Sequence, residues 1–202
     1  MRRGNLIVIS APSGAGKTTI VKRILKEDEY VSFSISYTTR KMRDGEVDGK
    51  DYFFVDEETF KNMIDEDEFL EWAKVYGNYY GTSKTFVNKI LEGGKDVLLD
   101  IDVQGARQVK EKDKDATLIF IIPPSFRELE RRLRGRGTDS REVIEKRLKI
   151  AKSEIMEYKI YDFLVINDML DEAVLNVRKI IDAMRFKRKN MSFYVEKILK
   201  EG

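Results

Sequence analysis

The chain has 202 residues, of which 42% are hydrophobic and 37% are charged, and its net charge is only +2. This balance excludes the strongly basic surface typical of nucleic-acid-binding proteins, and no apolar run reaches the length that a membrane span requires. The absence of cysteine and histidine excludes disulfide frameworks, thiolate metal sites and histidine-based catalysis. We therefore expect one cytoplasmic domain with no nucleic-acid or membrane partner.

A strand is predicted at residues 6–9, followed by a turn of small residues and a helix that opens with Lys17 and Thr18. Glycines in such a turn let successive backbone N–H groups point inward, and the helix N-terminus adds a positive field. The order of strand, glycine-rich turn and helix predicts a phosphate-binding loop. Its candidate residues are Ala11, Pro12, Ser13, Gly14, Ala15, Gly16, Lys17, Thr18 and Thr19.

This loop departs from the usual pattern at one position, because Ala11 stands where the pattern begins with glycine. An ordinary tight turn, rich in small residues, is the alternative interpretation. In a phosphate loop, Lys17 would reach the terminal phosphates and the Thr18 hydroxyl would hold Mg²⁺.

Residues 31–36 alternate between apolar and polar and predict a half-exposed strand. The polar segment 37–52 that follows carries Arg40 and Arg43, whose planar guanidinium groups suit bidentate capture of a phosphate. A solvated loop is the alternative interpretation of this segment.

A compact subdomain is predicted over residues 52–86. It comprises a strand at 52–55, a helix near 57–66 and a strand at 69–75, one face of which carries Glu71. We interpret Trp72 as an aromatic packing residue.

A helix at 84–91 is predicted to end at Gly93 and Gly94. The next buried strand, at 97–102, places Asp100 and Asp102 at its carboxyl end, where open α/β sheets bind ligands. Asp100 is a candidate to hold water around Mg²⁺, and Asp102 is a candidate to face the substrate. Strand-end carboxylates also cap turns and helices, which is the alternative for both.

A third buried strand at 117–122 ends at two prolines, and Ser125 with Glu128 forms a capping-box pattern for the helix that follows. This helix leads into an arginine-rich, glycine-containing connector at 131–137 and a helix at 141–158. The connector is predicted to be a lid that closes on phosphates. A solvated helix end whose cations complement the helix dipole is the alternative.

The last buried strand is predicted at 163–166, followed by Asn167 and an amphipathic helix over about 171–187. The charge run 185–190 is interpreted as solvated surface. Residues 191–200 are predicted to extend the last helix or to form another short one.

Together these motifs resemble the guanylate kinase family over nearly the whole chain. The matching segments are 10–18, 36–40 with Arg43, 45–52, 68–72, 77–81, 99–105, 132–137 and 165–168. The resemblance implies an α/β fold: a three-layer P-loop nucleoside triphosphate hydrolase-like core with a parallel central sheet, a small mixed α/β GMP-binding subdomain and a helical lid. We expect the core at 1–32, 84–125 and 159–202, the subdomain at 33–83, and the lid at about 126–158.

The resemblance also implies an activity, MgATP + GMP ⇌ ADP + GDP, with dGMP as a further acceptor. Lys17, Arg132, Arg136 and Arg147 would act on the ATP phosphates, and Asn167 would lie beside the adenine. Ser36, Glu71, Thr82 and Asp102 would read guanine, while Arg40, Arg43, Tyr52 and Tyr80 would hold the GMP phosphate. Mg²⁺ would be held by Thr18 and, through water, by Asp100.

The chemistry of guanine agrees with this role for Glu71. Guanine presents two adjacent donors, N1–H and an amine, to which an ionised carboxylate offers only acceptors. Phosphoryl transfer onto a phosphate needs neither cysteine nor histidine, because the acceptor oxygen is already anionic. Two alternatives remain at this stage: a non-catalytic protein-binding module of the same fold, and a kinase of this fold for another phosphorylated acceptor.

Overall fold

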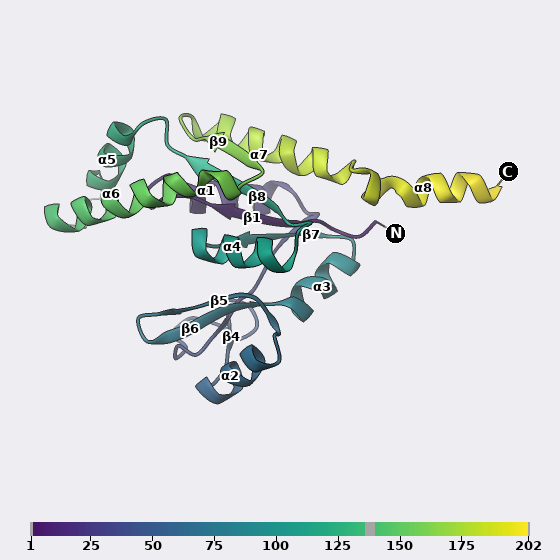
Figure 1. The fold of residues 1–202 in the computed structure, drawn as a ribbon, viewed down its shortest axis with the longest axis horizontal. Coiled ribbons are helices and arrows are strands. Elements are labelled where there is room, and N and C mark those ends of the chain that lie inside the picture. The colour runs from purple at the N-terminus through teal and green to yellow at the C-terminus, as the bar shows by residue number, and fades with distance from the viewer. Residues whose placement is uncertain (1, 136–139, 202) are drawn as a thin grey trace.

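The computed structural model describes residues 2–135 and 140–201. Its centre is a five-stranded parallel sheet with the strand order β2-β7-β1-β8-β9 (Figure 1). The strands are β1 (Leu6–Ser10), β2 (Val31–Phe33), β7 (Asp96–Asp100), β8 (Thr117–Ile122) and β9 (Phe163–Ile166). β1 is buried along its whole length, which explains why its sequence is continuously apolar instead of alternating.

Helices cover both faces of this sheet and bury the alternate residues of β1. On one face, α1 (Lys17–Glu27) and α7 (Leu170–Arg185) enclose a core that includes Ile7 and Ile9. On the other face, α3 (Lys84–Glu92) and α4 (Val103–Lys112) enclose a core that includes Leu6 and Val8. These layers confirm the predicted three-layer fold class.

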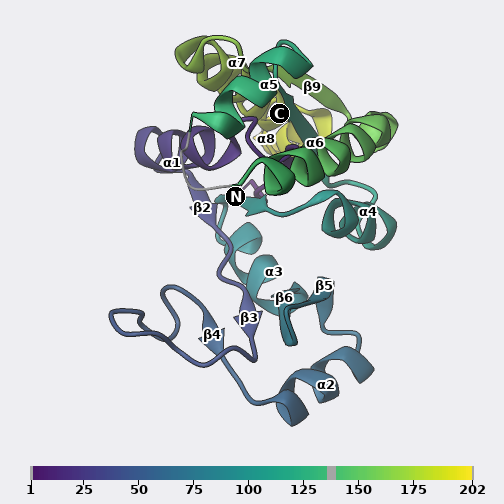
Figure 2. The same cartoon turned by 90° about the vertical axis from the view of Figure 1, so that its left-hand side faces the viewer.

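A second sheet lies apart from the first and carries the predicted subdomain (Figure 2). Its strand order is β4-β3-β6-β5, with one parallel and two antiparallel pairs. Its elements are β3 (Tyr37–Thr38), β4 (Phe53–Phe54), α2 (Glu57–Asp65), β5 (Phe69–Val75) and β6 (Asn78–Ser83). Phe60 stacks on Phe69, with ring centroids 4.4 Å apart, and supplies the core of this unit.

Two helices and a short 3₁₀ turn fill the interval between β8 and β9. They are α5 (Phe126–Arg134), α6 (Arg141–Met156) and η1 (Glu157–Ile160). Leu129 and Leu133 of α5 pack on Ile144 and Ala151 of α6 in a small core separate from the two large ones. The helix α8 (Arg188–Glu201) follows α7 and extends away from the sheet (Figure 1).

Several boundaries differ from those predicted. The strand expected at 31–36 ends at Phe33, and the segment expected to be a loop begins with β3. The strand β6 and the helix α4 were not predicted at all. The hairpin that joins β5 to β6 turns at Tyr76 and Gly77, whose φ angles are +49° and +84°; such a turn is usually signalled by Asn-Gly, which is absent here.

The charge run at 185–190 is not solvated throughout, so that interpretation was wrong for two residues. Asn190 is buried, and Arg185 is half-buried because its Nε donates to Asp96 Oδ2 (2.7 Å) and its Nη2 to Asp28 Oδ2 (2.8 Å). Sequence patterning could not reveal these partners, since they lie 89 and 157 positions away along the chain. Among the described residues, no helix has both the length and the apolar character needed to cross a bilayer.

Candidate active site

The phosphate loop joins β1 to α1 at the carboxyl edge of the large sheet. Gly14 and Gly16 have φ angles of +94° and +96°, values that L side chains rarely adopt. A Cβ at Gly16 would lie 2.3 Å from Nδ2 of Asn167, and a Cβ at Gly14 would lie 2.9 Å from Cδ2 of Leu133. The sequence therefore needs glycine at both positions for backbone conformation and for close packing.

The loop borders a cavity of about 280 Å³. The cavity is lined by Ala11, Pro12, Ser13, Gly14, Gly16, Lys17, Thr18 and Thr19, together with Glu154 from α6. Ala15, although predicted with this set, is fully buried, and its carbonyl accepts a hydrogen bond from Nδ2 of Asn167 (2.7 Å). Backbone donors at a helix N-terminus make this cavity suited to an anion.

Lys17 lies between this loop and the end of β7. Its Nζ is 2.5 Å from Oδ1 of Asp100 and donates to the carbonyl of Ile101 (3.0 Å). The parallel register pairs Ile9 with Asp100, so the strand that ends in the phosphate loop runs beside the strand that ends in the carboxylate. This register brings Lys17 and Asp100, which are 83 positions apart, to the same edge of the sheet.

The residues around Lys17 fit a magnesium ion. The exposed Thr18 hydroxyl and the Asp100 carboxylate are hard oxygen ligands, the class that Mg²⁺ prefers. The described residues contain no group of three or more acidic side chains arranged to hold a metal by themselves. Mg²⁺ is usually bound by one or two protein ligands, water and substrate phosphates.

A second cavity, of about 290 Å³, lies on the other side of the loop. It is lined by Gly14, Gly16, Thr19, Arg132, Asn167, Asp168 and Leu170. Arg132 donates from Nη2 to the carbonyl of Asn167 (2.9 Å) and from Nε to Glu128 Oε1 (2.7 Å). Its guanidinium group and that of Arg131 lower the pKa of Glu128 to about 2. Arg147 is half-buried on α6, and Arg136 lies outside the described residues.

Glu71 is buried on β5, where its Oε1 accepts a hydrogen bond of 2.5 Å from the Thr82 hydroxyl on β6. Burial and, to a smaller extent, the negative charge of Asp102 raise the pKa of Glu71, and the Thr82 hydrogen bond lowers it; the net pKa is about 7. A β-bulge between Phe69 and Glu71 interrupts the alternation of β5.

The first turn of α4 lies against Glu71. A Cβ at Gly105 would lie 3.2 Å from Oε2 of Glu71, so glycine allows this close approach. Asp102 caps α4 by accepting from the backbone N–H of Gly105 (2.8 Å), and its side chain remains exposed. Helix capping therefore accounts for one hydrogen bond of the Asp102 carboxylate, and the exposed side chain can still contact a ligand.

Arg40 forms a bidentate pair with Glu46, with Nη2–Oε1 and Nη1–Oε2 distances of 2.7 and 3.0 Å. Its guanidinium carbon lies 5.4 Å from the centroid of the Tyr52 ring, and the Tyr52 and Tyr80 rings are 6.1 Å apart. Arg43 contributes its backbone N–H to Glu46 Oε2 (2.8 Å) while its residue is exposed. Ser36 is half-buried, and its carbonyl accepts from Phe53 N (2.9 Å).

Three residues at these sites were not identified from the sequence: Glu46, Gln108 and Glu154. Gln108 on α4 accepts from Trp72 N (3.1 Å) and donates to Trp72 O (3.0 Å), which fixes the strand residue that follows Glu71. Glu46 had a local signal, an acidic residue six positions after Arg40. Gln108 and Glu154 had none, because their partners lie far away in the sequence.

A glycine-rich phosphate loop at the carboxyl end of a central parallel strand, followed by a helix, defines this protein as a P-loop protein. The family model described as guanylate kinase matches residues 3–184. The guanylate kinase of Zymomonas mobilis is 55% identical over 189 residues, covering 93% of this chain and 88% of that protein. The guanylate kinase of Carboxydothermus hydrogenoformans is 48% identical over 202 residues, covering 100% and 98%.

A solved structure agrees with the sequence relatives. The crystal structure of guanylate kinase from Anaplasma phagocytophilum superposes with a TM-score of 0.71 at 34% identity, covering 94% of this chain and 90% of that one. The chain belongs to the guanylate kinase family.

Proposed function

We propose that this chain transfers the terminal phosphate of ATP to GMP, producing ADP and GDP, with the phosphate loop as donor site and the second sheet as acceptor site. The observation that carries this proposal is the buried carboxylate of Glu71, held by Thr82 beside α4. α4 begins directly after β7, the strand whose Asp100 contacts Lys17 of the phosphate loop. The two sites are thus joined through one strand and one helix.

On the donor side, the backbone amides of residues 11–18 hold the phosphates and Lys17 neutralises their charge. Arg132, Arg136 and Arg147 add positive charge from the lid, and Asn167 lies beside the adenine. Thr18 and Asp100 would hold Mg²⁺, which when bound neutralises phosphate charge that develops during transfer. Lys17 contacts Asp100 at 2.5 Å, and its ammonium group has three donors with which to contact a phosphate as well.

On the acceptor side, ionised Glu71 accepts hydrogen bonds from the two adjacent donors of guanine. The Thr82 hydroxyl keeps the carboxylate oriented, and Ser36 and Asp102 bind the remaining base edge. Arg40, Arg43, Tyr52 and Tyr80 hold the phosphate of GMP in line with the terminal phosphate of ATP. The bidentate pair of Arg40 with Glu46 (2.7 and 3.0 Å) fixes the guanidinium group beside the Tyr52 ring.

Catalysis in this arrangement is positioning together with charge stabilisation. The acceptor oxygen is anionic at neutral pH, so a general base is not required. The mixed sheet unit and the lid approach each other over the bound nucleotides and exclude water, which limits hydrolysis of ATP. The use of dGMP as acceptor and a cytoplasmic location remain predictions from the sequence.

The donor assignment is tested by replacing Lys17 with alanine. We expect Lys17→Ala to lose at least a thousandfold in kcat at saturating GMP, because a charge needed in the transition state is removed. Lys22→Ala, an exposed lysine on the same helix, should retain full activity. Normal turnover by Lys17→Ala in an ADP-release assay would overturn the donor assignment.

A further inference from the structure

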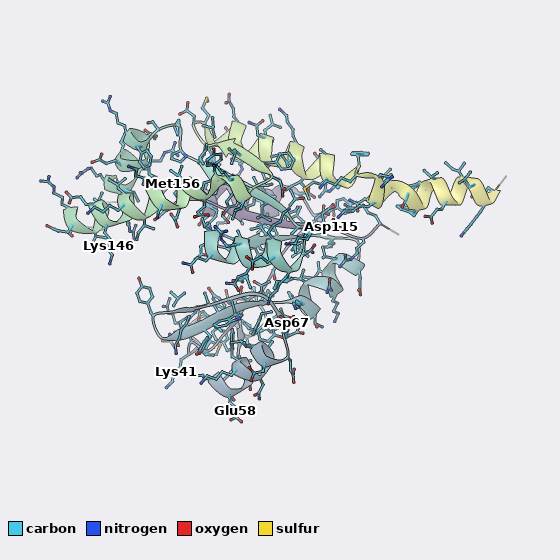
Figure 3. All side chains as sticks on the ribbon, in the orientation of Figure 1. Lys41, Glu58, Asp67, Asp115, Lys146 and Met156 are labelled. Atoms are coloured by element: carbon cyan, nitrogen blue, oxygen red, sulfur yellow. The ribbon has the colours of Figure 1, made fainter. Side chains whose placement is uncertain are left out.

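Glu154 is a carboxylate placed at a site built for anions. It lies in the last turns of α6, the helix on which Figure 3 labels Lys146 and Met156, and it lines the cavity whose other walls are residues 11–14 and 16–19. The proposed function assigns this cavity to the phosphates of ATP, and the present inference rests on that assignment. A carboxylate in this position faces the same backbone donors that a phosphate would use.

Only part of the hydrogen-bonding capacity of the Glu154 carboxylate is used by its surroundings. Its Oε2 is buried from solvent and has no hydrogen-bond partner among the described residues. Burial raises the pKa of Glu154; a hydrogen bond from the backbone N–H of Ser13 and the charge of Lys17 oppose that rise, whereas the charge of Asp102 adds to it. Buried polar atoms are normally paired, so an unpaired oxygen needs an explanation.

Packing alone does not explain the choice of glutamate. Ile144, Leu148 and Ala151 of α6 pack on α5, and Ile155 packs against the core that includes Leu6 and Val8. α5 in turn lies close to Gly14 of the loop. Ala151 lies three residues before Glu154 and therefore on a neighbouring part of the same helix face. An apolar residue at 154 would extend that face without burying an unpaired oxygen.

We propose that Glu154 acts as a competing anion: its carboxylate binds at the phosphate loop and is displaced by the terminal phosphates of ATP. Two anions cannot share the same donors without repulsion, so binding of ATP pushes the carboxylate out of the cavity. Arg147 lies seven residues earlier, two helical turns away on the same side of α6. Glu154 and this predicted lid arginine therefore belong to the same helix.

Competition between the Glu154 carboxylate and the ATP phosphates is expected to lower the affinity for ATP and to leave the affinity for GMP unaltered. Removing the charge with Glu154→Gln keeps the size of the side chain and abolishes the competition. We expect MgATP and inorganic tripolyphosphate to bind about fivefold more tightly, the scale of one like charge in a partly screened site. The dissociation constant for GMP should stay within about twofold, since its site lies on the other sheet.

Isothermal titration calorimetry on the full chain measures these affinities, with thermal unfolding of each variant as the check on folding. Glu145→Gln is the matched control, because it removes the same charge from an exposed position on the same helix; its affinities should equal those of the parent. Glu154→Ala provides a second variant in case the amide of glutamine makes new hydrogen bonds in the cavity.

Tighter binding of both phosphate ligands in Glu154→Gln or Glu154→Ala, without the same change in Glu145→Gln, would support the proposal. Unchanged or weaker binding in both variants, at a melting temperature equal to that of the parent, would overturn it. An ADP-release assay with GMP on the unmodified chain distinguishes a wrong role for Glu154 from a wrong proposed function. If only the competing-anion role is wrong, the unmodified chain still transfers phosphate to GMP.

Discussion

At the scale of single residues, Glu71 experiences two opposing demands. Recognition of two guanine donors requires the ionised carboxylate, whereas burial favours the protonated form and raises the pKa to about 7. The Thr82 hydroxyl, 2.5 Å from Oε1, stabilises the charged form and offsets part of the desolvation cost. The residue is therefore balanced between its two protonation states near neutral pH.

This balance predicts a pH dependence of GMP binding. Because GMP selects ionised Glu71, whose pKa is about 7, the KM for GMP should rise about tenfold between pH 8 and pH 6, when only about a tenth of Glu71 is ionised. The contribution of Glu71 to the stability of the ligand-free protein depends on pH in the opposite direction and is greater at low pH. The raised pKa stabilises the fold below the ordinary value of 4.5, and this contribution is lost as the pH rises through about 7. Steady-state kinetics across pH 6–8 measure the first effect.

The phosphate of GMP also titrates, with a pKa of about 6, so the assignment to Glu71 needs a variant. Glu71→Gln cannot ionise, and we expect its KM for GMP to keep only the weaker pH dependence due to the phosphate. The amide presents a donor to guanine, so GMP selectivity over AMP should fall by at least about a hundredfold. Parental selectivity, or a parental pH profile, in this variant would exclude Glu71 from base recognition.

At the scale of elements, the phosphate loop depends on close approach to the segment after β9. Gly16→Ala would place a Cβ 2.3 Å from Nδ2 of Asn167 at a φ angle of +96°. We expect this variant to lose about 2–3 kcal/mol of stability and most of its ATP affinity, since both the backbone and the contact are strained. Urea unfolding and ATP titration measure the two losses.

Gly45 offers a matched comparison for this substitution. Its φ angle is +85°, but a Cβ there would have no heavy atom within 4 Å. Gly45→Ala therefore carries the backbone strain without the clash, and we expect a loss of about 1 kcal/mol. Equal losses in the two variants would show that the contact with Asn167 is unimportant.

The sequence predicts the elements whose signals are local and misses those whose signals are not. The phosphate loop, the buried strands β1, β7 and β8 and the Ser125 cap, which accepts from Glu128 N (3.1 Å), all follow from short patterns. The prediction that β9 is buried was wrong, because β9 is an edge strand of the sheet and only Val165 of its four residues is buried. The strand β6 was missed because its hairpin turns at Tyr76, a non-glycine residue with positive φ. The position of Glu154 at the loop and the burial of Arg185 depend on contacts between distant segments, which no local pattern records.

At the scale of the whole molecule, the N-terminal segment and the end of α7 are joined through one buried carboxylate. Asp96 on β7 is fully buried and accepts hydrogen bonds from Arg2 (3.0 Å), Arg185 (2.7 Å) and both the backbone and side-chain nitrogens of Asn5 (2.8 Å each). The N-terminal segment, the central sheet and the end of α7 thus meet at one side chain.

Removing this carboxylate should destabilise the protein far from the substrate sites. Asp96→Ala leaves Arg185 without its partner on β7, and we expect a loss of about 3–5 kcal/mol in the free energy of unfolding. Burial raises the pKa of Asp96, but the hydrogen bonds from Arg185, Arg2 and Asn5 outweigh it and lower the pKa below 3.8. Its contribution is therefore present at neutral pH and is lost as the pH falls below that value.

Urea unfolding measures the loss, with Asp115→Asn as the control. Asp115 pairs with Lys189 at 2.9 Å, but its side chain is 77% exposed, so this change should cost at most about 1 kcal/mol. If Asp96→Ala lost no more unfolding free energy than Asp115→Asn, this would contradict the view that the buried network stabilises the contact between the N-terminal segment and the end of α7.

In the proposed reaction, ATP phosphates bind the loop at residues 11–18 while Glu71 selects guanine on the facing sheet. Release of ADP with saturating MgATP and equal concentrations of GMP, dGMP, AMP or ribose 5-phosphate tests this claim most directly. We predict turnover with GMP and dGMP and a kcat/KM for AMP lower by a factor on the order of 10⁴, because the buried carboxylate would face an adenine ring nitrogen without a donor. Equal turnover of AMP and GMP, or no transfer to GMP, would contradict the account.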